Sequence, residues 1–161
     1  MSHIADRLQA LGLVLPRAAH VDPSVKLPFT PALVRGNVVF LSGHAPLNPD
    51  GTLAGPFGKV GADLTPEEGH AAARLTTLAM LGSLQRAIGD LDRVKGWRRI
   101  FGMVNAAPGF THLPGVLNGC SELILELYGP ERGAHARSAV GMAELPFNIP
   151  VEIEAEVELE R

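Results

Sequence analysis

The sequence predicts an α+β domain in which the elements follow the order ββαβαββ after a short N-terminal helix. Residues 151–159 alternate apolar and glutamate side chains, which is typical of a strand with one buried face. Segments 65–91 and 111–127 carry apolar residues at helical spacing. Two long helices are too few to cover both faces of the sheet. We therefore expect both on one face of a mixed sheet, with the other face solvated or buried against another subunit.

The start of the chain is expected to lie outside this arrangement. Residues 4–11 have apolar side chains at helical spacing, and Gly12 follows as a stop. Residues 13–28 contain three prolines and are predicted to form an extended connector. We divide the chain into an N-terminal helix and connector, residues 1–28, and a domain, residues 29–161.

A β-hairpin is predicted directly after the connector. Its strands span about 29–35 and 38–42, and Gly36-Asn37 forms a two-residue turn in which a positive φ is easy. Residues 44–63 contain Pro-Asp-Gly and Gly-Pro sequences, which indicate a loop.

The two long helices carry boundary signals. Thr65 can cap the first helix, Pro66 suits its first position, and Glu68 can complete a capping box. The second helix is predicted to begin at Thr111 and to end at Gly129-Pro130.

The central strand is predicted at 94–105, where simple alternation places Trp97, Arg99 and Phe101 on one face. A face that combines these side chains with the glutamates of the last strand predicts a polar contact between subunits of a closed cyclic assembly. The basic and aromatic residues 95–99 could touch RNA, but their alternation between two faces favours a structural role.

Composition limits the classes of function. A length of 161 residues suits one domain, a single cysteine excludes an intramolecular disulfide, and a net charge of −3 argues against nucleic acid as a partner. No apolar run is long enough to span a membrane and the start lacks a secretory apolar region, so we expect a cytoplasmic protein with no membrane partner. The six histidines form no pair at i, i+4 spacing, and no phosphate-binding glycine loop is present, so we expect no metal or nucleotide site.

Two charged residues near the last strands are candidates for chemistry. The Arg137 guanidinium can bind a carboxylate through two parallel hydrogen bonds, and the alternative is a salt bridge at the surface or an interface. Glu152, if half-buried, could have a raised pKa and move protons, and the alternative is one more solvent-facing glutamate. Taken alone, each residue favours its structural alternative.

Other polar residues leave alternatives open. Ser42, Gly43 and His44 could offer backbone and side-chain donors to a ligand, or they could form an ordinary turn. Asn118 lies inside a helix, where its amide could point into a pocket or cap a neighbouring backbone group. Cys120 occupies an apolar helix position and is expected in the core, not as a nucleophile.

Several segments of the chain form a recognisable series. They are Gly36–Gly43, Pro46, Pro49–Gly51, Val116–Asn118, Tyr128-Gly129, Ala136–Ala139, Leu145-Pro146 and Val151–Glu154. In this order, these segments resemble the RidA/YjgF family of reactive-intermediate deaminases, also called L-PSP endoribonucleases. The resemblance covers nearly all of residues 29–159, and residues 1–16 are similar to the N-terminal extension of a longer branch of the family.

The resemblance implies a chorismate-mutase-like fold, a homotrimer with sites in the clefts between subunits, and no cofactor. It implies hydrolysis of 2-enamine and 2-imine acids to 2-keto acids and ammonia, so the expected partner is a small 2-imino or 2-keto acid. In the family the residue that matches Arg137 binds the substrate carboxylate, and the one that matches Glu152 positions or activates water. By the same resemblance, Asn118 and Ser42-Gly43 line the site.

Two positions depart from the family pattern. Phe29 stands where the family has a site tyrosine, which predicts an altered substrate preference, a weak activity or none. Ala139 stands where the family has a cysteine, and it can serve if only its backbone contacts substrate. The alternatives are a non-enzymatic trimer that binds a small carboxylate and, against the negative net charge, an endoribonuclease.

Strand geometry constrains how Arg137 and Glu152 can cooperate. If the last two strands formed a simple hairpin, Glu152 would lie opposite about Met142, and Arg137 would be about 16 Å further along. One small substrate cannot bridge that distance. Either the two strands are not directly paired, or the two residues meet across a subunit boundary. We expect the second arrangement, which predicts an inactive monomer.

Overall fold

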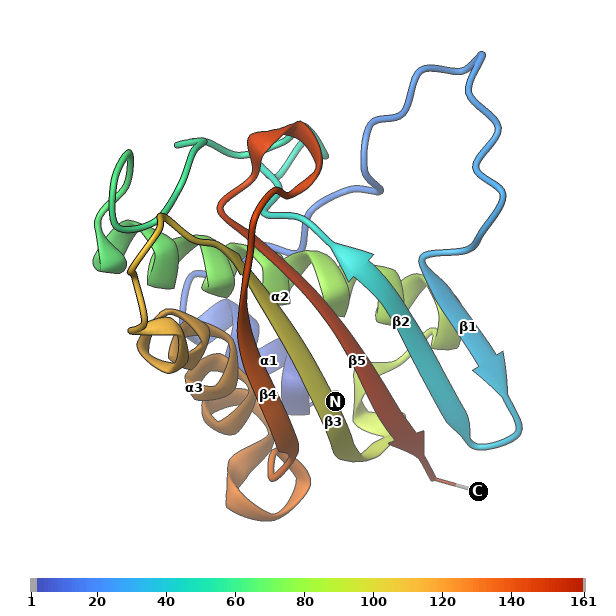
Figure 1. Cartoon of the computed structure of the whole chain (residues 1–161). Coiled ribbons are helices and arrows are strands. Elements are labelled where there is room, and N and C mark those ends of the chain that lie inside the picture. The colour runs from blue at the N-terminus through green and yellow to red at the C-terminus, as the bar shows by residue number, and fades with distance from the viewer. Residues whose placement is uncertain (1–2, 161) are drawn as a thin grey trace.

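The computed structural model describes residues 3–160 and confirms the α+β architecture (Figure 1). The helices are α1 (His3–Ala10), α2 (Pro66–Ile88) and α3 (Leu113–Arg132), and 3-10 turns occupy Leu91–Arg93 and Pro146–Asn148. The strands are β1 (Ala32–Arg35), β2 (Val38–His44), β3 (Val94–Asn105), β4 (Ala136–Met142) and β5 (Val151–Leu159). Within residues 3–160, no helix is long and apolar enough to cross a membrane.

The five strands form one mixed sheet in the order β1-β2-β5-β3-β4. Strand β4 runs parallel to β3, and all other neighbours are antiparallel. Since β3 lies between β4 and β5, the last two strands are not a hairpin. Helices α2 and α3 cover one face of the sheet, as predicted, and the opposite face is uncovered in the single chain (Figure 1).

The core lies between the sheet and the helices. Strand β5 is central, and its apolar residues at alternate positions from Val151 to Leu159 are buried against the helices. Its four glutamates lie on the uncovered face and are half-buried or exposed. Full burial of each aliphatic side chain contributes about 1.5–3 kcal/mol. The hydrophobic effect therefore fixes which face of β5 the glutamates occupy.

The predicted boundary signals of α2 and of the hairpin are confirmed. The Glu68 amide donates to Thr65 Oγ1 at 3.1 Å, and the Thr65 amide donates to Glu68 Oε2 at 2.8 Å. The hairpin turn places Gly36 at φ 59°, which a residue without a Cβ tolerates. Strand β1 begins only at Ala32, because Pro31 has no N–H for the ladder.

Helix α3 differs from the prediction at both ends. It begins at Leu113 rather than Thr111, which puts Pro114 in the first turn, where a missing N–H removes no intrahelical bond. Gly129 interrupts the helix with φ 77° and ψ 176°, but one more turn follows and reaches Arg132. The Gly129-Pro130 sequence therefore marks a kink inside the helix, and the helix ends one turn later, at Arg132.

The prediction that Trp97 shares a face with Arg99 and Phe101 is wrong. A β-bulge between Trp97 and Arg99 shifts the register with β5, so Trp97 pairs with Val157 on the helix side. There the Trp97 ring packs edge-on against Tyr128, with centroids 5.9 Å apart. Arg99 and Phe101 stay on the uncovered face.

Candidate active site

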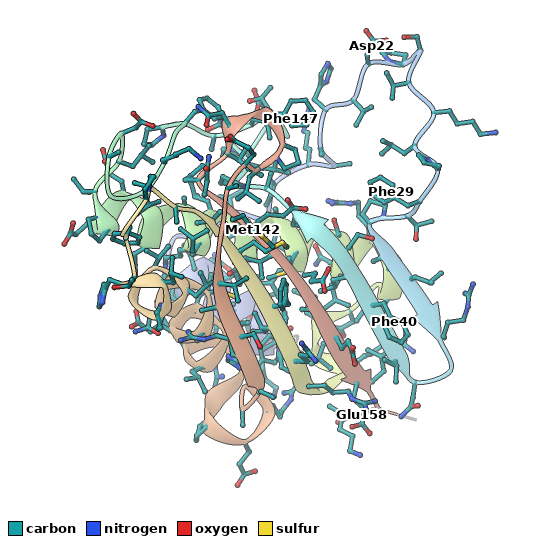
Figure 2. The ribbon with its side chains drawn as sticks, in the orientation of Figure 1. Asp22, Phe29, Phe40, Met142, Phe147 and Glu158 are labelled. Carbon is teal, nitrogen blue, oxygen red and sulfur yellow. The ribbon has the colours of Figure 1, made fainter. Side chains whose placement is uncertain are left out.

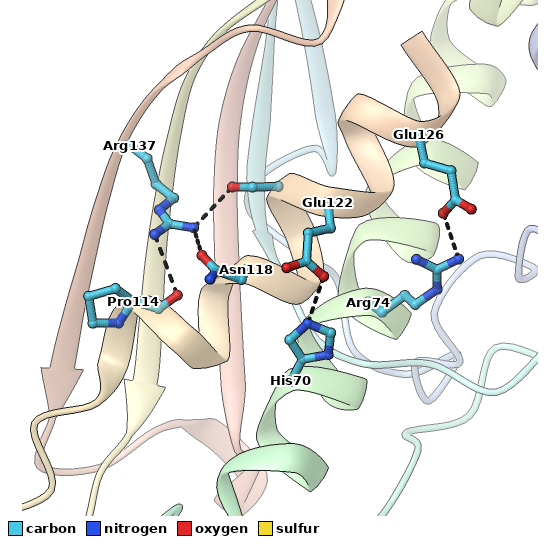
Figure 3. Close-up of polar contacts among 8 residues, drawn as sticks. His70, Arg74, Pro114, Asn118, Glu122, Glu126 and Arg137 are labelled. Carbon is cyan, nitrogen blue, oxygen red and sulfur yellow. Dashed lines mark hydrogen bonds and ion pairs between the residues drawn. The ribbon is translucent and has the colours of Figure 1, made fainter. Parts of the chain in front are cut away.

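Arg137 lies on the edge strand β4, and its guanidinium reaches across to α3 (Figure 3). Nη1 donates to Asn118 Oδ1 and to Ser121 Oγ, both at 3.0 Å, and Nη2 donates to the Pro114 carbonyl at 3.4 Å. All three acceptors are neutral. In the described part of the chain Arg137 has no carboxylate partner, so the surface salt bridge considered from the sequence is not formed within the subunit. Its positive charge is fixed in place and uncompensated.

Ser121 and His135 extend this arrangement, and both were missed from the sequence. His135 Nδ1 lies 2.7 Å from the Gly133 carbonyl, which can only accept, so this nitrogen carries the proton. His135 Nε2 then accepts from the Ser121 hydroxyl at 2.8 Å. Ser121 follows Asn118 by three helix positions, so both face Arg137. That spacing could have revealed Ser121.

One ion pair and one histidine–glutamate contact beside Arg137 tie α2 to α3 (Figure 3). His70 Nε2 lies 3.0 Å from Glu122 Oε2, and Arg74 Nη2 lies 2.9 Å from Glu126 Oε2. Arg74 therefore has a carboxylate partner, whereas Arg137, in the same region, has none among the described residues.

Glu152 lies on the uncovered face at the start of β5, directly against Gly43. Gly43 belongs to the β-bulge of β2 between Leu41 and His44. A Cβ at this position would overlap the Glu152 carboxylate, so only glycine permits the contact. Burial, and secondly the charge of Glu154, raise the pKa of Glu152 above its ordinary value. A carboxylate in this state is a stronger base than an exposed glutamate.

His44 is turned into the core and offers no donor to a ligand, contrary to one alternative from the sequence. Its Nδ1 lies 2.6 Å from the Ser42 carbonyl, and its Nε2 lies 2.8 Å from Ser83 Oγ. Arg86 donates to the same Ser83 oxygen at 3.1 Å. The ring therefore holds the Ser42 carbonyl, and with it the peptide unit that leads into Gly43, from the buried side.

Burial lowers the pKa of His44, and the nearby charge of Arg86 acts in the same direction. The folded protein keeps this ring neutral, whereas the unfolded chain protonates it below about pH 6.5. The contribution of His44 to the free energy of unfolding is therefore present above about pH 6.5. It is lost as the pH falls toward the lowered pKa of His44 in the folded protein. The free energy of unfolding is expected to fall with a slope of up to about 1.4 kcal/mol per pH unit.

Denaturant unfolding of His44→Gln between pH 7 and pH 5 checks this expectation. The variant should lose that part of the slope, while His70→Gln, at a more exposed position on α2, should keep it. A His44→Gln protein with the slope of the unchanged protein would contradict the role given to this ring.

A hollow of about 680 Å³ opens on the uncovered face beside Ser42. Phe29 lies in the bend just before β1, and Phe40 lies on β2 (Figure 2). Phe29 is 54% exposed in the single chain, so its apolar ring faces solvent there. Its lining includes Phe29, Leu33, Phe40, Ser42, Arg99 and Phe101.

The predicted site residues fall into two groups. Arg137 is in register with Ile100, and Glu152 with Met103, which lies three residues further along β3. Three residues along a strand and two spacings between neighbouring strands place the Cα atoms of Arg137 and Glu152 about 14 Å apart. The Glu152 group lies on the uncovered face and contains Phe29, Ser42 and Gly43. The Arg137 group lies on the helix side at the sheet edge and contains Asn118 and Ala139.

Cys120 is fully buried in the core, as predicted. Burial raises the pKa of its thiol to about 12, so the thiolate needed of a nucleophile is not formed at neutral pH. Within residues 3–160, no three His, Cys, Asp or Glu side chains gather in a way that could hold a metal ion.

Comparison with known proteins adds four likenesses. The family model described as "YjgF/chorismate mutase-like, putative endoribonuclease" matches residues 5–155. Protein TCP17 of Trypanosoma cruzi is 44% identical over 156 residues, 97% of this chain and 94% of that protein. Atu1372 of Agrobacterium tumefaciens, whose function is unknown, is 37% identical with a TM-score of 0.87, over 98% of this chain and 93% of that chain. Escherichia coli TdcF, solved with bound serine, shares the fold at 18% identity and a TM-score of 0.59, over 89% of this chain and 99% of that chain.

Proposed function

Because this chain belongs to the YjgF/chorismate mutase-like family, we propose that it hydrolyses reactive 2-imino and 2-enamine acids to 2-keto acids and ammonia. The observation that carries the proposal is the Arg137 guanidinium, which three neutral oxygens hold while its charge stays uncompensated. Such a group binds a carboxylate through two parallel hydrogen bonds. TdcF, which shares the fold, was solved with serine, an amino acid that carries a carboxylate.

The site we propose is completed by a second subunit of a homotrimer. Arg137 and Glu152 are too far apart within one chain to hold one small substrate. The uncovered sheet face also exposes apolar side chains, among them Leu33 at 38% and Phe40 at 43%, which favours a neighbouring subunit on that face. Placing the β4 edge of one subunit against that face of the next brings the two groups together.

In this cleft Arg137 fixes the carboxylate of a protonated 2-imino acid and so orients the C=N carbon. Glu152 accepts a proton from water as the oxygen bonds to that carbon and the C=N pair moves to nitrogen. The product is a carbinolamine. Transfer of the proton to the amine lets the C–N bond break and ammonia leave, and the carbinolamine hydroxyl becomes the carbonyl of a 2-keto acid after losing its proton.

The environment of Glu152 suits the role of base. Its raised pKa brings the proton affinity of the carboxylate closer to the pH at which the reaction runs, and a positioned base of this kind contributes about 10²–10⁴-fold to a rate. No hydrogen bond from the described residues to the Glu152 carboxylate is present, so its oxygens remain available to water.

An assay of the unmodified protein tests the proposal. 2-Iminopropanoate is generated in situ from alanine by an amino-acid oxidase, and its loss is followed with and without the protein. We expect the protein to accelerate hydrolysis above the spontaneous rate. Absence of acceleration for iminopropanoate and for imino acids with larger side chains would overturn the proposal.

A further inference from the structure

We propose, building on the carboxylate site of the function proposed above, that Ser121 and His135 are positioning residues for Arg137. They hold its guanidinium so that the edge formed by Nε and Nη2 receives the carboxylate of the ligand. Ser121 contacts Arg137 directly, and His135 acts through Ser121. Neither the family description nor the names of the relatives assign a role to these two residues.

The arrangement joins two side chains near β4 to two side chains of α3. His135 lies just before β4 and Arg137 lies two residues later, at the period that places side chains on the same side of a strand. Asn118 and Ser121 are one turn apart on α3. Ser121 Oγ lies 2.8 Å from His135 Nε2 and 3.0 Å from Arg137 Nη1. One hydroxyl group therefore links the histidine to the arginine.

The direction of these hydrogen bonds is set by the backbone at the end of α3. A Cβ on Gly133 would lie 2.6 Å from the Gly129 carbonyl oxygen, so a side chain would clash with the backbone at this turn. The Gly133 carbonyl accepts from His135 Nδ1 at 2.7 Å, which leaves Nε2 of the neutral ring without a hydrogen. Nε2 therefore accepts the hydroxyl hydrogen of Ser121.

This direction makes Ser121 an acceptor toward Arg137. The hydroxyl group of a serine inside a helix can otherwise donate to the carbonyl four residues earlier. Here His135 holds the hydroxyl hydrogen, and a lone pair of the oxygen faces Arg137 Nη1. Asn118 Oδ1 accepts from the same nitrogen at 3.0 Å (Figure 3). Both N–H groups of Nη1 are therefore used by neutral acceptors.

The donors that remain on Arg137 determine how a carboxylate binds. A guanidinium binds both oxygens of a carboxylate either through Nη1 and Nη2 or through Nε and Nη2. The first edge has no free hydrogen on Nη1, and the Pro114 carbonyl takes only one N–H of Nη2. Among the described residues nothing accepts from Nε or from the other N–H of Nη2. The contacts thus select the edge of Nε and Nη2.

The test measures the Kd for pyruvate by calorimetric titration, which does not depend on hydrolysis. Ser121→Ala removes one acceptor of Nη1, so the guanidinium can turn and use its other edge. We expect the Kd to rise about 10-fold, because a hydrogen bond to a charged group is lost. Ser121→Thr keeps the hydroxyl group and should restore the Kd to within about 3-fold of the unmodified protein.

His135 is tested through its dependence on Ser121. His135→Leu removes the acceptor and should raise the Kd by about 3-fold, whereas His135→Gln offers an amide oxygen and should raise it less. The double variant Ser121→Ala with His135→Leu should have the Kd of Ser121→Ala alone, since His135 acts only through the hydroxyl group. His70→Leu is the matched control, because His70 contacts Glu122 on α3 and not Ser121.

Two results would show that Ser121 and His135 serve only to stabilise the fold. One is a folded Ser121→Ala protein that binds pyruvate like the unmodified protein. The other is a Ser121→Thr protein with as weak a binding as Ser121→Ala. Effects of Ser121→Ala and His135→Leu that add in the double variant would overturn the action of His135 through Ser121. If Ser121→Ala does not fold, equal Kd values for His135→Leu and His135→Gln would overturn the proposal.

The positioning and the proposed function fail in different ways. The expected Kd changes without any acceleration of imine hydrolysis would overturn the proposed function and support the positioning of Arg137. Acceleration of hydrolysis with unchanged Kd values in the folded variants would support the function and overturn the positioning. An unmodified protein that binds no pyruvate would overturn the positioning, whatever the hydrolysis assay shows.

Discussion

Arg137→Ala is expected to abolish the acceleration of imine hydrolysis while the chain stays folded. The substitution removes two charge-assisted hydrogen bonds to the substrate carboxylate, each contributing about 1.5–3 kcal/mol, so kcat/KM should fall by about 10²–10⁴-fold. Among the described residues of the subunit, the guanidinium contacts only neutral oxygens at a sheet edge. The free energy of unfolding should therefore change by about 1 kcal/mol.

Arg74→Ala is the matched control for this variant. Arg74 lies on α2 in the same region, but Glu126 already pairs with it, so its loss should leave kcat/KM unchanged (Figure 3). Arg137→Lys keeps the charge without the planar fork and should give an intermediate rate. An Arg137→Ala protein with the kcat/KM of the unmodified protein would remove the basis of the proposed function.

Glu152→Gln is expected to lower kcat by about 10²–10⁴-fold, because an amide cannot accept the proton from water. Binding of a small 2-keto acid should change by only a few-fold, because Arg137 provides the main contact with its carboxylate. Steady-state kinetics and calorimetric titration with pyruvate measure the two effects separately.

This variant also distinguishes an enzyme from a non-enzymatic trimer that binds a carboxylate. In a binding protein, Glu152→Gln would leave both the affinity and any slow background hydrolysis as they are. Glu67→Gln is a control, because Glu67 is a glutamate in the first turn of α2, outside both groups of site residues. Equal kcat values for Glu152→Gln and the unmodified protein would favour the binding function.

Features that depend on near neighbours in the chain could be predicted from the sequence. The capping box joins Thr65 and Glu68, three residues apart, and the hairpin turn depends on Gly36 and its neighbour. The alternation of β5 follows from its own side chains, because the period of two needs no partner. The family expected from the motifs, and the fold that it implies, are confirmed by the match over residues 5–155.

Features that depend on distant segments could not be predicted in the same way. Trp97 changes face because of a bulge in the register between β3 and β5, which are far apart in the sequence. The position of β3 between β4 and β5 is likewise a property of the whole sheet. The alternation of side chains along a single strand predicts neither the bulge nor the order of the strands.

The candidate site shows the same division. Resemblance to the family selected Arg137, Asn118 and Glu152, and the structure joins the first two by a hydrogen bond of 3.0 Å. Ser121 was missed although its spacing from Asn118 could have revealed it, and His135 was missed because its contact with Ser121 depends on how the segment after α3 folds back. The meeting of Arg137 with Glu152 stays a prediction, since the single chain holds them about 14 Å apart.

Mixed trimers of two inactive variants test most directly whether the site is shared between subunits. Arg137→Ala and Glu152→Gln chains, carrying different affinity tags, are co-expressed in equal amounts, and trimers containing both are confirmed by native mass spectrometry. If each site takes its arginine from one subunit and its glutamate from the next, random mixing restores about one quarter of the sites, and about one quarter of the unmodified activity returns. If both residues act within one chain, every site in the mixed trimers lacks one of them. No recovery of activity in verified mixed trimers would therefore contradict the account.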